Sequence, residues 1–223
     1  MNDRERLAGI DPCGVERASV LDRAFYDRAP EFVARGLLGR HLIRRSREGV
    51  VTGRIVETEA YLFREDPACH AARGRTPSNR AMFGPPGHAY VYPIHSRYCF
   101  NVVTERRGIG SAVLIRAVEP LAGVALMQRR RRRDAIRDLA RGPARLCEAF
   151  AIDRRLDHHN LTVPRQLWIA DPRDGIPEGG QIGCSPRIGV TSGHGLLLRY
   201  FVLNNPFVSG TRRHQRRFTH EES

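Results

Sequence analysis

The sequence of 223 residues contains no lysine, because all 37 of its basic residues are arginine. A mechanism in which an internal lysine forms a Schiff base is therefore excluded, and the N-terminal amine is the one primary amine left. A genome of biased base composition would produce the same pattern. The absence of lysine thus excludes one kind of mechanism but does not indicate a function.

Cysteines and long apolar runs are also scarce. The five cysteines are scattered and contain no Cys-x-x-Cys pair. This argues against a zinc ribbon, an iron–sulfur cluster or a disulfide framework, and we expect no metal and no other cofactor. No apolar run approaches the roughly 18 residues of a membrane helix, and the charged N-terminus lacks a signal-peptide core. We therefore expect a reducing intracellular location (cytoplasm or nucleoid, or the nucleus in a eukaryote) without membrane contact.

Charge is the strongest deviation of the composition. The formal net charge is +13 and the sequence pI is about 10.8, while 41% of the residues are hydrophobic, as in a globular protein. Such a balance favours a polyanionic partner, either nucleic acid or an anionic membrane. The arginine runs 129–133 and 212–217 could contact phosphates, or they could be solvated surface.

The length favours one domain, which we expect to be a monomer. We expect a flexible segment over residues 1–20, a folded domain over 21–210 and a disordered basic tail over 211–223. Hairpins and loops join the expected strands, which favours an α+β domain with a mainly antiparallel, curved sheet flanked by helices. The expected helices begin at Pro30, at Glu119-Pro120 and at Pro143, and the expected strands cover 41–44, 50–61, 89–92, 99–104, 111–118, 167–170, 187–190 and 198–203.

The segment Arg54–Tyr61 reads as a strand with two carboxylates on one face. Successive side chains of a strand point to opposite faces, so Glu57, Glu59 and Tyr61 share a face. Two glutamates roughly 7 Å apart would suit holding a water molecule for hydrolysis of a glycosidic bond. The alternative is that each glutamate pairs with one of the many arginines, and the pattern leaves both open.

Aromatic side chains give a second signal. Tyr90 and Tyr92 point the same way on a predicted strand, where they would serve core packing or stacking on a base. Tyr61 and Tyr92 could bracket a planar ligand. His70 lies in a polar loop without further metal ligands at suitable spacing, so it is either an exposed ring or a stacking one.

An arginine interrupts the apolar strand predicted for residues 111–118. Burying Arg116 is costly unless it is paired with a carboxylate, and Glu59 is the natural candidate. The pair could be purely structural or part of a site.

Motifs of one family follow each other in order between residues 25 and 210. They are Leu37–Gly39, Gly53–Tyr61, Asp66–His70, Thr76–Arg80, Met82-Phe83, Pro86-Gly87, Tyr90–Tyr92, Asn101-Val102, Leu114–Pro120, Gly142-Pro143, Leu146-Cys147, Arg187–Val190 and Asn205–Ser209. In this ordered series the sequence resembles the alkyladenine (3-methyladenine) DNA glycosylase family.

The resemblance implies an enzyme of base-excision repair. Such an enzyme flips alkylated or deaminated purines, for example 3-methyladenine or hypoxanthine, out of double-stranded DNA and hydrolyses the N-glycosidic bond. Glu59 would then activate the water and Arg116 would help to position it. Glu57 has no comparable role, so we expect it to be a structural partner of an arginine.

The same resemblance assigns the base pocket. The flipped base would lie between the rings of Tyr61, His70 and Tyr92, Asn101 would screen purines at the exocyclic 2-amino position, and the backbone at Val190 would line the pocket. The absence of lysine adds that the glycosylase would be monofunctional, without a lysine-based lyase step.

The chain departs from the family where the side chain that enters the duplex gap is expected. A tyrosine commonly stands three residues after the Tyr92 position, and here that residue is His95. The span to Asn101 is also one residue short, so Tyr98 is a second candidate, and we assign Arg97 beside it to DNA binding. This departure keeps open a lesion-recognition DNA-binding protein with weak or no excision activity. Charge alone would fit a general nucleic-acid-binding module.

Overall fold

The computed structural model of the chain describes residues 19–172 and 181–211. The basic tail lies almost wholly outside these residues, as does most of the segment expected to be flexible at the N-terminus. Ser19 and Val20, which we had included in that segment, form a strand instead. The described chain therefore begins within the sheet.

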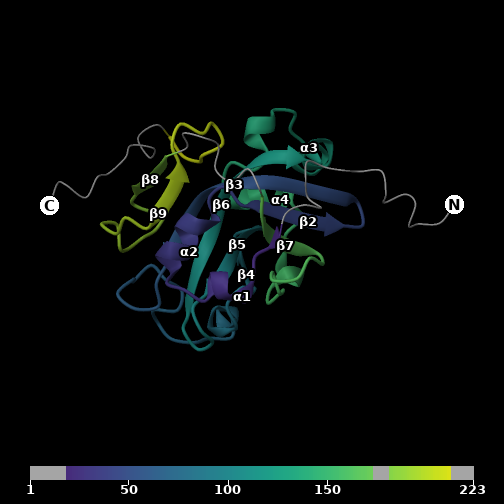
Figure 1. The fold of residues 1–223 in the computed structure, drawn as a ribbon. Coiled ribbons are helices and arrows are strands. Elements are labelled where there is room, and N and C mark those ends of the chain that lie inside the picture. The colour runs from purple at the N-terminus through teal and green to yellow at the C-terminus, as the bar shows by residue number, and fades with distance from the viewer. Residues whose placement is uncertain (1–18, 173–180, 212–223) are drawn as a thin grey trace.

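One antiparallel sheet organises the molecule. Its path is β1-β7-β2-β3-β6-β5-β4, and β9 pairs with β3 while carrying β8 at its other edge. The strands are β1 (Ser19–Val20), β2 (His41–Ser46), β3 (Gly49–Tyr61), β4 (Ala89–Ile94), β5 (Arg97–Thr104), β6 (Ser111–Ala122), β7 (Leu167–Asp171), β8 (Ile182–Ser185) and β9 (Arg199–Val202). Figure 1 shows that the sheet is curved around the long strands β3 and β6. The predicted α+β class is confirmed.

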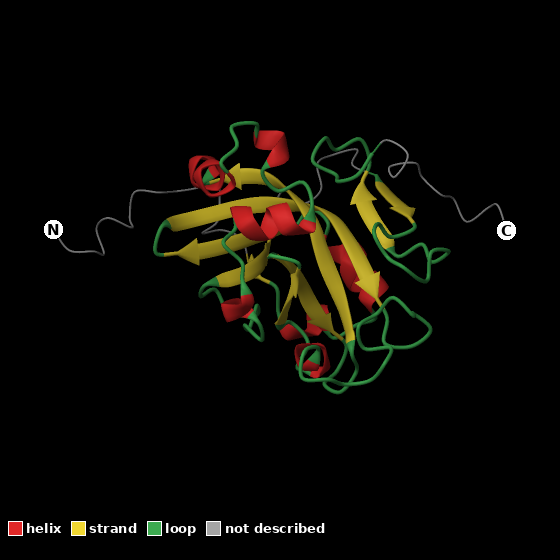
Figure 2. Ribbon diagram, turned by 180° about the vertical axis from the view of Figure 1, so that it is seen from behind, coloured by secondary structure: helices red, strands yellow, loops and turns green. Residues whose placement is uncertain are grey.

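Helices cover both faces of this sheet. The α-helices of the described residues are α1 (Arg23–Tyr26), α2 (Pro30–Leu37), α3 (Val124–Arg131) and α4 (Pro143–Ala149), and the short 3₁₀ helices are η2 (Arg80–Phe83), η3 (Ile136–Asp138) and η4 (Arg154–Leu156). In Figure 1, α2 lies in front of the sheet, and Figure 2 shows α4 in front of the opposite face. Both α2 and α4 begin with proline in the first turn, as predicted.

The main core lies where these helices meet the sheet. Leu37 of α2 and Phe150 after α4 are fully buried with Ile55 of β3 in one cluster. Phe32 of α2 points away from this core and is 68% exposed. A smaller cluster, which includes Met82 and Tyr90, takes in Cys69 and Ala71 of the long loop after β3. This second cluster supports the candidate site.

Two expected elements were wrong. The predicted helix start at Glu119-Pro120 is the end of β6, because Pro120 pairs with Gly53 at an irregularity of the ladder, where a missing N–H is tolerated. The helix starts later, after Gly123, whose φ of 71° and closeness to the Val50 carbonyl exclude a side chain. The predicted strand at 187–190 is irregular backbone.

Candidate active site

Lateral pairing brings the candidate site residues together. Glu59 pairs with Leu114, Leu114 pairs with Asn101, and Asn101 pairs with Tyr90. Directly paired residues of neighbouring strands project to the same face, so this row places Glu59 and Asn101 two strands apart on one surface. Thr58 points the other way and donates to the Ala34 carbonyl of α2 at 2.9 Å. The alternation predicted for this strand is confirmed.

Glu59 is fully buried, and three donors hold its carboxylate. Oε2 accepts from the Tyr61 hydroxyl at 3.0 Å and from Nη1 of Arg116 at 3.1 Å. Oε1 accepts from the backbone N–H of Ile188 at 2.8 Å. The predicted pairing of Arg116 with Glu59 is confirmed. The Ile188 donor was not foreseen, because it comes from a loop 129 residues further along the chain.

A β-bulge directs Arg116 toward this carboxylate. Glu57 pairs with Ala117 and Thr58 pairs with Ile115, so Arg116 has no partner in the ladder between β3 and β6. Such a bulge re-aims a side chain. Burial alone would lower the pKa of Arg116, but the carboxylates of Glu59 and Glu57 outweigh it and raise that pKa. The guanidinium therefore stays charged in the interior.

Glu57 is the structural partner that the sequence predicted. Its Oε1 accepts from Nε of Arg116 at 3.1 Å and from Nε of Arg199 at 2.7 Å. Ser209 donates its N–H to Oε2 at 2.7 Å and its hydroxyl to Oε1 at 2.9 Å. Burial alone would raise the pKa of Glu57, but the two guanidinium groups and the Ser209 N–H hold it below its usual value. Arg199 and Ser209 were missed at the sequence level.

An aromatic cleft opens in front of Glu59. Its volume is about 730 Å³, and an inner cavity of about 20 Å³ lies at its base. Tyr61, His70, Tyr90 and Tyr92 line both spaces, Asn101 lines the inner cavity, and Val190 lines the outer cleft. The structure thus brings together every residue that the sequence assigned to the base pocket. Glu59 lies behind the Tyr61 hydroxyl.

The aromatic rings of the cleft contact one another, and these contacts fix their positions. Tyr92 packs edge-on against His70 with ring centroids 4.6 Å apart, and the Tyr90 hydroxyl lies 2.9 Å from Nδ1 of His70. Burial raises the pKa of Tyr61 and of Tyr92, so both keep their hydroxyl protons. Partial burial lowers the pKa of His70, which keeps part of its ring open to solvent. At neutral pH this wall of the cleft carries no charge.

A buried ion pair between Arg187 and Asp66 lies beside the Tyr61 ring, and neither residue has a role that the sequence predicts. Nη1 and Nη2 of Arg187 each donate to one oxygen of the Asp66 carboxylate at 2.6 Å, and the guanidinium lies 4.6 Å from the centre of the Tyr61 ring. Asp66 also accepts from the N–H groups of Leu62 and Ala68. The pair joins the loop that carries His70 to the ring of Tyr61.

The β4–β5 hairpin carries the residues expected to contact DNA. His95 lies at the exposed tip with a φ of 51°, in a turn of two residues. Arg97 is exposed and lies 3.6 Å from Glu148 of α4. Tyr98 is half-buried and packs against the main core. This packing argues against Tyr98 as the residue that enters the duplex.

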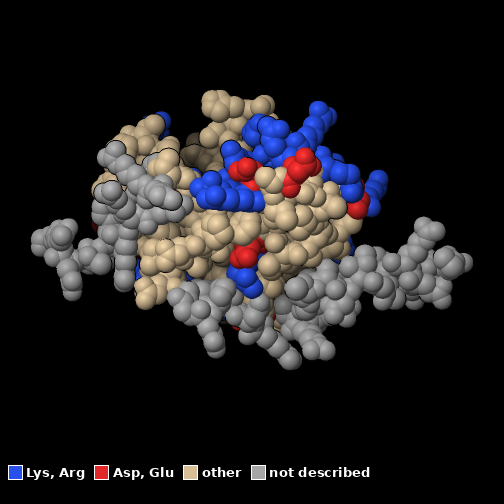
Figure 3. Space-filling model, turned by 90° about the horizontal axis from the view of Figure 1, so that it is seen from above, with Lys and Arg blue, Asp and Glu red and all other residues tan. Residues whose placement is uncertain are grey.

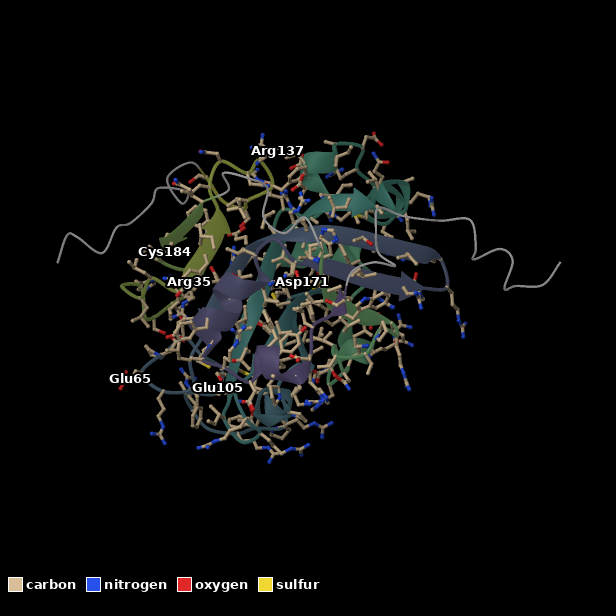
Figure 4. The ribbon with its side chains drawn as sticks, viewed as in Figure 1. Arg35, Glu65, Glu105, Arg137, Asp171 and Cys184 are labelled. Carbon is tan, nitrogen blue, oxygen red and sulfur yellow. The ribbon has the colours of Figure 1, made fainter. Side chains whose placement is uncertain are left out.

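The arginine run 129–133 lies at the other end of β3 from the aromatic cleft. Arg130 pairs with Glu48 at the β2–β3 turn, and Arg131 contacts Glu148. Arg137 follows the run, and Glu65 lines a cavity together with Asp66. Figure 4 shows these two residues at opposite ends of the molecule. Seen from above, the face that carries α3 gathers arginines beside a few carboxylates (Figure 3). Two of the five arginines thus have structural partners.

Within residues 19–172 and 181–211, no three His, Cys, Asp or Glu side chains gather as a metal site would require. In the same part of the chain, no helix is both long and apolar enough to cross a membrane.

A buried carboxylate lies behind an aromatic cleft in a protein of charge +13, an arrangement that suits a planar ligand and a polyanionic partner. Comparison with known proteins gives the family. The model of the methylpurine-DNA glycosylase (MPG) family matches residues 24–206. The chain belongs to this family, and the predicted resemblance is confirmed.

Curated relatives agree with the family match. A protein of Carboxydothermus hydrogenoformans is 44% identical over 85% of this chain and 98% of its own length. One of Rhodopirellula baltica is 47% identical over 88% of this chain and 86% of its own, and one of Methanocella arvoryzae is 45% identical over 85% and 96%. All three are provisionally named 3-methyladenine DNA glycosylases.

Proposed function

We propose that the protein is a monomeric, monofunctional DNA glycosylase that excises alkylated or deaminated purines, such as 3-methyladenine and hypoxanthine, from double-stranded DNA. The observation that carries the proposal is Glu59, a buried carboxylate held by Arg116 and Tyr61 behind an aromatic cleft. The damaged purine flips into this cleft and stacks against Tyr61, His70 and Tyr92. The positive charge of the protein attracts the phosphates of the duplex.

The reaction is a hydrolysis at the sugar carbon that carries the base. Glu59 accepts a proton from a water molecule, the water oxygen bonds to C1′, and the bond electrons leave with the purine. An alkylated purine that carries a positive charge is neutralised by these electrons, which makes it a good leaving group. Hypoxanthine is neutral in the duplex, so it leaves as its anion and is then protonated from water. Arg116 orients the Glu59 carboxylate through Nη1 and anchors on Glu57 through Nε. No amine of a lysine is needed.

Asn101 limits which purines enter. Its Nδ2 donates to the Tyr90 carbonyl at 3.1 Å, which fixes the amide at the inner cavity. That cavity has about 20 Å³, the space of about one water molecule, so an exocyclic amino group that entered it would lie directly against the Asn101 amide. Guanine differs from hypoxanthine by such a group at position 2, and we propose that this contact rejects it.

The proposal is tested by incubating the wild-type protein with duplexes that contain hypoxanthine or an alkylated adenine. The expected result is release of the free base, with strand breaks that develop only after heating in alkali. Undamaged duplex of the same sequence is the control. The absence of base release from every lesion would contradict the proposal, and strand breaks without alkali would contradict a monofunctional enzyme.

Stacking on Tyr92 is tested by replacing Tyr92 with alanine in a Glu59→Gln background, so that binding is measured without excision. We expect the dissociation constant for lesion duplex to rise about 5- to 150-fold, because stacking on one aromatic ring stabilises a base by about 1–3 kcal/mol. Tyr92→Phe is the matched control and should bind as the parent does, since the ring remains. Equal affinity of the alanine and phenylalanine variants would show that Tyr92 does not stack on the base.

A further inference from the structure

An apolar side chain is exposed at the tip of the β4–β5 hairpin. Ile94 is 43% exposed, and among the described residues the other large apolar side chains exposed to this degree are Phe32 and Ile136. Ile94 is the last residue of β4 and pairs with Arg97 across the two-residue turn. Because the turn has only two residues, the regular strand continues to Ile94 at the tip of the hairpin.

The pleat of β4 turns Ile94 toward the aromatic cleft. Tyr90, Tyr92 and Ile94 alternate with Val91 and Pro93, so these three share one face of the strand. The lining of the cleft agrees with this orientation, because Ile94 lines the cleft together with Tyr61 and Tyr92.

The neighbouring tip residues face elsewhere. Ser96, Arg97 and Tyr98 line a different cavity, on the side of α4. His95 occupies the left-handed first position of the turn and does not line the cleft among the described residues. Ile94 is therefore the large apolar side chain of the tip that stands at the mouth of the base pocket.

We propose that Ile94 enters the DNA duplex and fills the space that the flipped purine leaves. This inference rests on the proposed glycosylase function and replaces both His95 and Tyr98 as the residue with that role. Proteins that bind the minor groove frequently insert an apolar side chain, isoleucine among them, between base steps, where it makes van der Waals contact with the unstacked neighbours. An imidazole at position 95 would leave its polar nitrogens between stacked bases.

The test compares excision of one lesion from a duplex and from the same strand without its complement. A side chain that fills the duplex gap contributes only where a gap exists, whereas a residue that contacts the base contributes to both substrates. We expect Ile94→Ala to lower the single-turnover rate on duplex about ten- to hundredfold, the worth of burying an isoleucine side chain, and to leave the rate on single strands unchanged. Ile94→Met keeps an apolar side chain of similar volume and should restore most of the duplex rate.

Ile136→Ala, an equal truncation of an isoleucine that is 46% exposed away from the cleft, is the matched control and should behave as wild type. A duplex rate unchanged by Ile94→Ala, or a similar loss on both substrates, would overturn the role of Ile94. A loss confined to duplex in His95→Ala instead would also overturn it. Failure of the wild type to excise either substrate would show that the proposed function itself is wrong, and the inference falls with it.

Discussion

Glu59→Gln is expected to abolish excision while leaving lesion binding intact. A general base contributes about 10²–10⁴-fold to a reaction rate, so we expect the single-turnover rate of base release to fall by that factor. The measurement is release of hypoxanthine from a duplex with enzyme in excess, together with the dissociation constant for the same duplex.

The fold should tolerate this change because the amide can be accommodated. The glutamine oxygen can accept from the Ile188 N–H, and the amide nitrogen can donate to the Tyr61 hydroxyl, which then turns. Arg116 keeps its contact with Glu57. Retained binding would show that the protein is folded.

Glu119→Gln is the matched control for this experiment. Glu119 lies on β6 and pairs with Arg54 at 3.3 Å, toward the end of the strand away from the cleft. It should release base at the wild-type rate. Excision by Glu59→Gln at the rate of this control would refute the role of Glu59.

Glu57→Gln is expected to have the opposite effect, a large loss of stability with excision retained. Removing one partner of a buried ion pair costs about 3–5 kcal/mol, because the remaining charges stay buried. Glu57 is fully buried and accepts from Arg116, Arg199 and Ser209, so the unfolding free energy should fall by about that amount. Denaturant unfolding measures it. At a temperature where the variant is folded, excision should stay within about tenfold of wild type, since a positioning role is lost and the general base remains.

The pH dependence of unfolding gives a second readout for Glu57. Its pKa is lowered in the folded protein from a usual value of 4.5, so its stabilising effect is present above that value and is lost as the pH falls below it. The difference between wild type and Glu57→Gln should therefore shrink in acid. Glu48→Gln removes the same charge from an exposed carboxylate that pairs with Arg130, and it should unfold as wild type does. Equal stability of Glu57→Gln and wild type would contradict the structural role.

Local rules were enough to predict much of the fold. Period-two alternation located β3 and its face, and proline in the first turn located α2 and α4. Local rules could not predict where β6 ends. Its last residues pair with β3 beyond an irregularity of the ladder, and this pairing depends on the partner strand. Residues 187–190 form a loop rather than the predicted strand, because four residues are too short for an alternation of apolar side chains to distinguish the two.

The candidate site was predictable where its parts share a strand. One alternating segment predicts that Glu59 and Tyr61 share a face. The pair of Arg116 with Glu59 was predicted because a buried arginine needs a carboxylate partner. The contacts of Ile188, Arg199 and Ser209 span more than 120 residues, and the bulge that aims Arg116 depends on the register of two strands. Such contacts exist only once the sheet has formed.

The most direct test of the proposed mechanism is single-turnover hydrolysis of a hypoxanthine duplex, with the products identified by mass spectrometry. We expect wild-type protein to release free hypoxanthine and to leave an intact strand with an abasic sugar that is not bonded to the protein. Glu59→Gln should bind the duplex and give neither product at a comparable rate. Wild-type protein that releases no base, a strand that stays bonded to the protein, or release by Glu59→Gln at the wild-type rate would contradict a water molecule activated by Glu59.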